Sequence, residues 1–191
     1  MTKDGKDRPR ETLIRQGAIL REVREVMIDN GLKPIFSDGI VLGIVRENDF
    51  IKWDFDADLF VHAELAMGKE YKILADFLKR GFIKIKLRSG LHDWKVAVEK
   101  EDYHIDLRAF YRDGDNHVSK VKRSNGLYSI YTMPARFMDN LQEVDFYGAK
   151  YFIPEDTDGY LTCLYDDWRK PIRSVKHSEY LSRTFKTGSK E

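Results

Sequence analysis

Three aspartates at alternate positions, Asp54, Asp56 and Asp58, are the residues of this sequence best suited to chemistry. Alternate side chains of a β-strand point to the same face, so neighbouring carboxylates would lie about 7 Å apart along one side of a strand. Like charges held this close repel and raise each other's pKa unless a cation neutralises them. Carboxylate oxygens are hard ligands, so the spacing predicts a site for Mg²⁺ or Mn²⁺.

The residues between these aspartates support the strand interpretation. The opposite face of the expected strand, 54–61, carries Phe55, Ala57, Leu59 and Val61. Burial of that face would fix the register and hold the acids rigidly. A calcium-binding loop is excluded, because its pattern needs glycine and glutamate where Leu59 and Leu65 stand. A solvated acidic strand edge is the other interpretation, although aspartate is depleted in strands.

A fourth carboxylate, Asp106, stands in a second alternating run further along the chain. Two-metal phosphoryl and nucleotidyl transfer uses three carboxylates from neighbouring strands, of which two bridge the ions and the third can accept the proton of the nucleophile. Asp56, Asp58 and Asp106 are therefore the predicted catalytic residues, and all three are predicted metal ligands. Asp54 is a further candidate metal ligand. The nearby His104 is expected to point to the opposite face, as a packed or surface histidine.

A glycine-containing segment, 37–46, precedes the aspartates and supplies groups that can bind phosphate. A strand that ends there and turns into a short helix would place backbone N–H groups and the positive end of a helix dipole near the acids. Gly39 and Gly43 would let the backbone approach a phosphate closely, although Gly43 could instead serve helix packing. Arg46 and Lys52 could clamp phosphate oxygens, although Arg46 could also be solvated.

Aromatic side chains beside the acids offer a way to bind a base. Trp53, Phe55 or a tyrosine from a later strand could stack on it or form a wall of the pocket. Core packing is the other interpretation of these rings. The predicted substrate-binding residues are therefore Gly39, Gly43, Arg46, Lys52 and Trp53.

Hydrophobic periodicity predicts both helices and strands. Helices are expected over 12–30, 39–46, 66–80 and 156–168. Strands are expected over 33–37, 54–61, 82–87, 94–98, 103–111, 126–132, 145–146 and 150–153. Because most strands follow one another along the chain, we expect a single α/β or α+β domain, with a mixed or antiparallel sheet flanked by helices.

Composition excludes several classes of protein. The 191 residues include 33 Lys and Arg against 32 Asp and Glu, so the basic excess of a dedicated nucleic-acid binder is missing. Cys163 is the single cysteine and can make neither an internal disulfide nor a cysteine zinc cluster. No apolar stretch approaches the roughly 20 residues of a membrane span, and no signal peptide is recognisable, so a cytoplasmic location is expected.

The two ends of the chain differ from its middle. Residues 1–11 are charged and expected to be flexible, and residues 173–191 form a basic tail. Such a charge run is usually solvated, although this one could contact an anionic membrane surface or an acidic acceptor. The domain that carries the acids is therefore expected within residues 12–172, and nothing in the sequence specifies an oligomeric state.

The glycine segment and the aspartate strand together resemble the signature of the LicD and fukutin-related family. SDGIVLGIVR at 37–46 is similar to the family's G-(S/T)-L-L-G-x-x-R, and DFIKWDFDADL at 49–59 is similar to I-P-W-D-x-D-x-D. The resemblance covers about residues 12–172. Its later blocks are IDL at 105–107, FYGAKYFIP at 146–154 and YLTCLY at 160–165.

This resemblance implies a nucleotidyltransferase-like fold and a metal-dependent phosphotransferase. Such an enzyme moves a substituted phosphate from a CDP-activated donor, such as CDP-choline or CDP-ribitol, to a hydroxyl of a glycan or glycolipid and releases CMP. By position, the family's metal-binding pair is matched by Asp56 and Asp58. Asp106 matches its third carboxylate, while Asp54 and Arg46 match the preceding acid and the arginine of the glycine segment.

Three departures from the family pattern leave the donor open: Ile40 in place of Ser or Thr, Lys52 in place of proline, and Asp166 in place of glycine. The main alternative is a nucleotidyltransferase that attaches NMP to a small molecule or sugar phosphate and releases pyrophosphate. A metal-dependent glycosyltransferase would leave Asp106 without a role. A non-catalytic binding module would have little reason to keep four acids facing one site.

Overall fold

The computed structural model describes residues 6–90, 92–122, 128–165, 167–173 and 187–189, the last three by their backbone alone. The helices are α1 (Arg10–Asp29), α2 (Asp38–Leu42), α3 (Ala63–Ala66), α4 (Glu70–Lys79), α5 (Arg136–Asp139) and α6 (Thr157–Leu164), and a π-helical turn, η1, spans Gly43–Glu47. The strands are β1 (Ile35–Phe36), β2 (Asp56–His62), β3 (Ile83–Ser89), β4 (Trp94–Lys100), β5 (Tyr103–Asp113), β6 (Asn116–Lys122), β7 (Tyr128–Pro134), β8 (Leu141–Phe146), β9 (Ala149–Pro154) and β10 (Thr187–Ser189).

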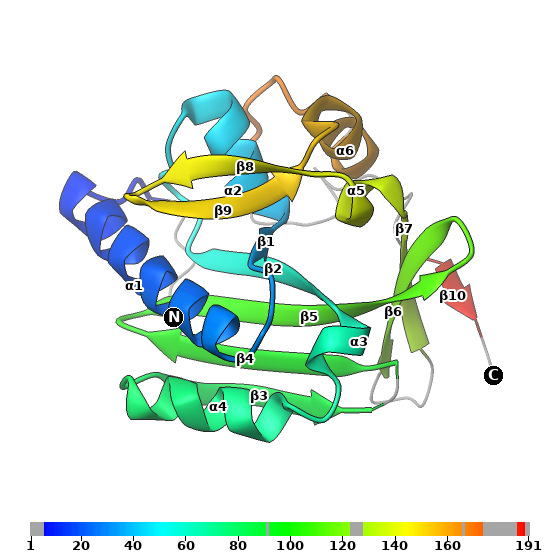
Figure 1. The fold of residues 1–191 in the computed structure, drawn as a ribbon. Helices are drawn as coiled ribbons and strands as arrows, with labels where there is room; N and C mark the ends of the chain where they lie inside the picture. The colour runs from blue at the N-terminus through cyan, green and yellow to red at the C-terminus, as the bar shows by residue number, and fades with distance from the viewer. Residues whose placement is uncertain (1–5, 91, 123–127, 166, 174–186, 190–191) are drawn as a thin grey trace.

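The strands form one mixed sheet with β5 at its centre (Figure 1). Its order is β10-β7-β6-β5-β2-β1-β9-β8, and β4 joins β5 as a branch that continues into β3. The pairs β2–β5 and β1–β9 are parallel, and the other pairs are antiparallel. The mixed sheet flanked by helices in a single domain confirms the fold class expected from the sequence.

One face of the central strands is apolar and forms the core. On β2, Ala57, Leu59 and Val61 are buried, and so are the residues opposite them on β5. Helix α4 packs against β3 and β4, and α1 packs against α4. Figure 1 shows α1 and α4 along one side of the molecule, with α2 and α6 close together near the β8–β9 hairpin. The alternating polar residues of β2 and β5 therefore face away from this core.

Two expected helices have different bounds in the structure. The helix predicted over 66–80 begins only at Glu70, as α4, because Gly68 just before it adopts a φ of +77°, and α3 is a separate short helix that ends at Ala66. The helix predicted over 156–168 ends at Leu164. At its start the Asp156 carboxylate accepts a hydrogen bond from the Gly159 N–H at 2.9 Å, a normal N-cap.

Among the described elements that have no expected counterpart are α3, α5, β6 and β10. Strand β6 pairs with the last residues of β5 and along the whole of β7, and α5 is a single turn between β7 and β8. Their sequences are short and rich in charge, so neither carries a clear period. Strand β7 begins at Tyr128, and residues 126–127 of the expected strand lie outside the described residues.

The ends of the chain are described only in part. Helix α1 begins at Arg10, slightly before the expected start, and residues 1–5 lie outside the described residues. Of the predicted basic tail, Arg173 and 187–189 are described, and β10 pairs antiparallel with β7. The rest of the tail, with its predicted membrane contact, lies outside them. No described helix combines the length and apolar character needed to cross a bilayer.

Candidate active site

Two parallel strands bring the predicted catalytic aspartates together. The register of β2 and β5 places Asp58 directly opposite Asp106, and Asp56 opposite His104. All four side chains lie on the polar face, because the residues between them along each strand are buried in the core. The structure thus gathers carboxylates from two neighbouring strands on one surface of the sheet.

Asp54 also belongs to this cluster, although it precedes the strand. Strand β2 begins at Asp56 instead of at the expected position 54. Burial raises the pKa of Asp54 well above its ordinary value, and the charge of Asp56 and a hydrogen bond with it raise the pKa further. The Arg8 guanidinium acts in the opposite direction. Asp54 and Asp56 therefore interact directly even though only one of them lies in the sheet.

Asp38 is a further member of the cluster, and the sequence analysis did not identify it. It opens α2 with a φ of +45°, its backbone N–H donates to the Tyr160 hydroxyl at 3.1 Å, and its carboxylate accepts from the Ser37 hydroxyl at 3.3 Å. Burial raises the pKa of Asp38 to about 6, although Arg108 and Ser37 act to lower it. The sequence feature that could have identified Asp38 is its position next to Gly39, in the segment predicted to bind phosphate.

Asp58 lies among the other carboxylates. Burial raises the pKa of Asp58 well above its ordinary value. Three neighbouring carboxylates raise it further: those of Asp38, Asp56 and Asp106. Arg108 acts to lower the pKa of Asp58, but its effect is smaller than the combined effect of burial and the carboxylates. The charged form of Asp58 is thus unfavourable in the protein alone, and a bound cation would remove that cost.

Asp106 is held by a histidine and a lysine side chain. Its Oδ1 lies 3.1 Å from His104 Nε2, and its Oδ2 accepts a hydrogen bond from Lys95 Nζ. Burial by itself raises the pKa of Asp106, but His104 and Lys95 outweigh burial and bring the pKa below its ordinary value. The expectation that His104 points to the opposite face is therefore wrong. Residues two apart on a strand share a face, so His104 and Asp106 must lie together.

Arg108 is the third residue of this face of β5. It stands opposite Phe60 of β2, and its guanidinium carbon lies 4.4 Å from the centre of the Tyr131 ring. Burial lowers the pKa of Arg108, but Asp58, Tyr131 and Asp38 together raise it above its ordinary value. Arg108 is therefore a fixed positive charge directed at the carboxylates. The two-residue spacing from Asp106 is the sequence signal that could have identified it.

The carboxylate cluster offers the donor atoms of a divalent metal site, but the described ligand atoms that lie within 4.8 Å of one another belong to another group, His62, His117 and Asp139. Asp38, Asp54, Asp56 and Asp58 offer oxygen ligands, and the raised pKa of Asp58 shows that its surroundings do not neutralise the charge. Such hard oxygen ligands favour Mg²⁺ or Mn²⁺ over softer metals. Asp106 can contribute as well, but a metal ion and Lys95 would compete for its carboxylate.

The raised pKa of Asp38 predicts a pH-dependent stability of the metal-free protein. Its pKa rises from 3.8 to about 6 on folding, so the folded state binds this proton more tightly than the unfolded state. The resulting stabilisation is complete below about pH 4 and is lost as the pH rises to about 6. We expect the free energy of unfolding, measured with urea in EDTA, to fall over this window. Asp38→Asn should flatten that part of the profile, and an unchanged profile would contradict the prediction.

The two glycines of the segment before the aspartates have different surroundings. A Cβ atom on Gly39 would lie 2.0 Å from Asp54 Oδ2, so this glycine allows the acid to approach the backbone of α2. A Cβ atom on Gly43 would lie 2.6 Å from the backbone oxygen of Asp49 and 3.1 Å from the backbone nitrogen of Ile51. Gly39 thus borders the carboxylates, whereas Gly43 allows η1 to pack against the following loop.

Gly43→Ala is expected to destabilise the protein by about 1–3 kcal/mol, because backbone atoms cannot move aside as a side chain would. Gly90→Ala is the matched control, since its Cβ would meet no atom closer than 3.6 Å. Urea denaturation of both variants measures the difference. Equal stability of the Gly43 variant and the wild type would contradict the close packing inferred here.

Of the two basic residues predicted to clamp phosphate, Arg46 is held in other contacts and Lys52 is exposed. Arg46 donates from Nε to Glu47 Oε1 at 2.7 Å and from Nη1 to the backbone oxygen of Trp168 at 3.2 Å. Lys52 is exposed, and its backbone oxygen accepts from the Arg8 N–H at 2.9 Å. The positive charges that act on the carboxylates in this structure come instead from Arg8, Lys95 and Arg108.

Trp53, predicted to stack on a base, is partly buried against the core. The Arg173 guanidinium carbon lies 4.9 Å from the centre of its ring. One edge of the ring system thus contacts the protein interior and Arg173 lies over it. Arg173 thus occupies one face on which a base could stack.

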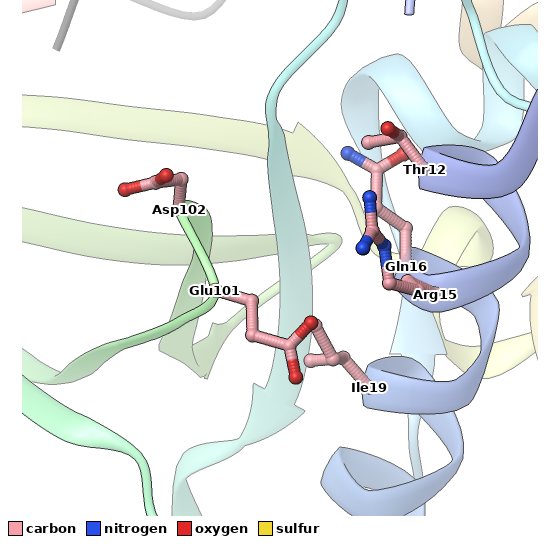
Figure 2. A pocket seen from close by; sticks show the side chains of 6 residues that line it. All are labelled: Thr12, Arg15, Gln16, Ile19, Glu101 and Asp102. Atoms are coloured by element: carbon pink, nitrogen blue, oxygen red, sulfur yellow. The ribbon is translucent and has the colours of Figure 1, made fainter. Parts of the chain in front are cut away.

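A separate cavity of about 220 Å³ lies between α1 and the turn that joins β4 to β5. Figure 2 shows the side chains from α1 on one side of it and those from the turn on the other. Its lining residues are Thr12, Arg15, Gln16, Ile19, Glu101 and Asp102. No predicted site residue is among them, so this cavity is not the candidate active site.

The paired acidic strands lie within a segment that matches a nucleotidyltransferase domain family. The family model described as LicD/FKTN/FKRP, nucleotidyltransferase domain, matches residues 33–156, more than half of the chain. The chain belongs to this family. The matched span contains the glycine segment and the four acids on which the resemblance rests, and the expected coverage of 12–172 extends past this span at both ends.

Two further comparisons complete this result. No curated protein matches the chain. Among solved structures, the antibiotic-resistance factor ANT(2'')-Ia is similar, with 14% sequence identity and a TM-score of 0.40. That similarity covers 54% of this chain and 51% of ANT(2'')-Ia, so it extends over about half of each protein.

Proposed function

We propose that this protein transfers a substituted phosphate from a CDP-activated donor to a hydroxyl of a glycan or glycolipid and releases CMP. Membership of the LicD/FKTN/FKRP family supports a transferase of this type. The single observation that carries the proposal is the register pair of Asp58 and Asp106 on the parallel strands β2 and β5. It supplies carboxylates from two strands at one place, as phosphoryl transfer requires.

In this proposal Asp56 and Asp58 hold Mg²⁺ or Mn²⁺, with Asp54 and Asp106 as further ligands. A bound ion would supply positive charge that stabilises the transferring phosphate and its leaving group. Arg108 and the backbone at Gly39 would offset the remaining negative charge of the phosphates. Their positions beside the carboxylates support this role.

Asp106 orients the acceptor hydroxyl in the proposed reaction. The acceptor oxygen forms a bond to the phosphorus that carries the donor head group, and the bond from that phosphorus to CMP breaks. The proton of the hydroxyl passes to Asp106, and CMP leaves with the electron pair of the broken bond. The lowered pKa of Asp106 keeps it ionised and able to accept a hydrogen bond from the hydroxyl.

The donor test is an incubation of the protein with CTP, CDP-choline, CDP-ribitol or CDP-glycerol in the presence of Mg²⁺. Mass spectrometry then follows CMP and pyrophosphate. CMP formed from a CDP-linked donor, even by slow hydrolysis without an acceptor, supports the proposal. Pyrophosphate formed from CTP, with the nucleotide left on the product, would establish the alternative of nucleotidyl transfer. Activity that persists in excess EDTA would exclude the metal role.

The basic C-terminal segment is the part of the chain proposed to bind the acceptor. We place the glycan or glycolipid acceptor near the basic residues of 173–191, whose charge suits an anionic surface. Binding of the full chain to vesicles that contain anionic lipid, compared with neutral vesicles, tests this part. Equal binding to both kinds of vesicle would contradict it and leave the donor chemistry unaffected.

A further inference from the structure

A second cluster of metal-binding side chains lies at the end of β2, outside the carboxylate site. His62 is the last residue of β2, His117 lies in β6, and Asp139 ends α5. One ligand atom from each of these residues lies within 4.8 Å of the other two. Elements far apart in the sequence thus bring two imidazoles and a carboxylate to one point.

The contacts within this cluster resemble those of a ligand set. The rings of His62 and His117 have centroids 5.2 Å apart at an interplanar angle of 68°. His117 Nε2 lies 2.7 Å from Asp139 Oδ1. The side chain of His117 is 2% exposed, and its Nδ1 has no hydrogen-bond partner among the described residues. Nε2 is therefore the nitrogen of His117 that faces Asp139 and would bind a metal, whereas Nδ1 lies on the other side of the ring.

The second carboxylate oxygen of Asp139, Oδ2, is held by Arg112. The Arg112 guanidinium hydrogen-bonds to Asp139 Oδ2 and leaves Oδ1 on the side of the two histidines. Ligating carboxylates commonly carry such an outer hydrogen bond, which fixes their direction. Arg112 is therefore compatible with metal binding by Asp139, because it occupies the oxygen that a metal would not need.

We propose that His62, His117 and Asp139 bind one Zn²⁺, with a fourth position open to solvent. Two imidazole nitrogens and one carboxylate oxygen form a donor set that suits Zn²⁺, whereas Mg²⁺ prefers oxygen ligands alone. His62 is four residues beyond Asp58 on the same strand, which corresponds to about 13 Å. The site is therefore distinct from the carboxylate cluster and binds a different class of metal.

Zinc binding here would join three parts of the fold. Helix α5 is a single turn between β7 and β8, and Asp139 at its end is partly exposed. A metal bound to Asp139 and both histidines would tie this turn to β2 and β6. We therefore expect Zn²⁺ to raise the thermal stability of the protein, because ligands that bind only the folded state stabilise it.

The test uses the full chain after removal of metals, with Zn²⁺ followed by calorimetry and Co²⁺ by its visible absorption. Wild type and Asp58→Asn should each bind one equivalent with nitrogen ligation, which shows that the carboxylate cluster is not responsible. His62→Gln and Asp139→Asn should weaken binding by about tenfold or more and abolish the rise in Tm. His92→Gln, at an exposed histidine outside the cluster, is the matched control and should bind as wild type does.

Two results would overturn the proposal. One is the absence of Zn²⁺ binding by the wild-type chain. The other is Zn²⁺ affinity in both His62→Gln and Asp139→Asn that stays within about twofold of the wild-type value. Asp139 is exposed, so Asp139→Asn is expected to fold, and circular dichroism checks that it does. A result with this variant therefore decides the question even if a variant of the buried His117 fails to fold.

Discussion

Replacing Asp58 with asparagine is expected to abolish transfer while raising the thermal stability of the metal-free protein. Activity should fall by roughly 1,000-fold or more, because charge stabilisation by a bound metal contributes several kcal/mol to such reactions. Stability should rise because burial and three neighbouring carboxylates raise the pKa of Asp58, so its charged form is unfavourable in the folded protein. The asparagine keeps the shape of the side chain and removes that charge.

The measurements are CMP release and thermal unfolding in EDTA. The sign of the stability change follows from linkage, since a carboxylate whose pKa is raised by folding destabilises the folded state as the pH rises above the ordinary pKa of the group. Asp113→Asn, at an exposed position near the end of β5, is the matched control and should change neither quantity. A less stable Asp58→Asn protein, or one with normal turnover, would show that the carboxylates do not form the proposed centre.

Replacing Arg108 with glutamine should have the opposite effect on stability. Its guanidinium is the positive charge that acts on both Asp38 and Asp58, so its removal leaves carboxylates without compensation. Loss of one partner from a buried group of charges costs about 3 kcal/mol or more. We therefore expect Arg108→Gln to be less stable by about that amount in EDTA, and to regain part of the loss when Mg²⁺ is added.

Urea denaturation of single and double variants isolates this effect. Arg136→Gln is the matched control, because Arg136 also stacks on a ring, that of Phe137 at 4.6 Å, but is exposed. In the double variant with Asp58→Asn, the cost of losing Arg108 should be smaller than in the wild-type background. Equal costs in the two backgrounds would mean that Arg108 and Asp58 do not interact.

Local patterns in the sequence are sufficient to predict most of the fold and the centre of the site. The apolar stripe of α1 and the alternation of β2 and β5 depend only on neighbouring residues, so they can be read before any tertiary contact is known. The same alternation places Asp56 and Asp58 on one face. It also places His104 beside Asp106, and the wrong expectation for that histidine came from misapplying the two-residue period.

Other features depend on contacts that no local pattern contains. Helix α4 begins at Glu70 instead of at residue 66, after Gly68 adopts a φ of +77°. Strand β6 is held by its pairing with β5 and β7 rather than by its own composition. Because strand propensity is set largely by packing against neighbours, such a strand is weakly marked in the sequence.

The sequence by itself determined which carboxylates are available, and the tertiary structure decided which charges meet them. The antiparallel register of β4 and β5 puts Ala97 opposite Asp106. Lys95 lies two residues from Ala97 on the same face, so its side chain reaches Asp106. Likewise, β1 pairs with β2, and the chain then carries Asp38 to the side of Asp58. Strand order and register follow from how the buried faces pack together, and that packing joins residues far apart in the chain.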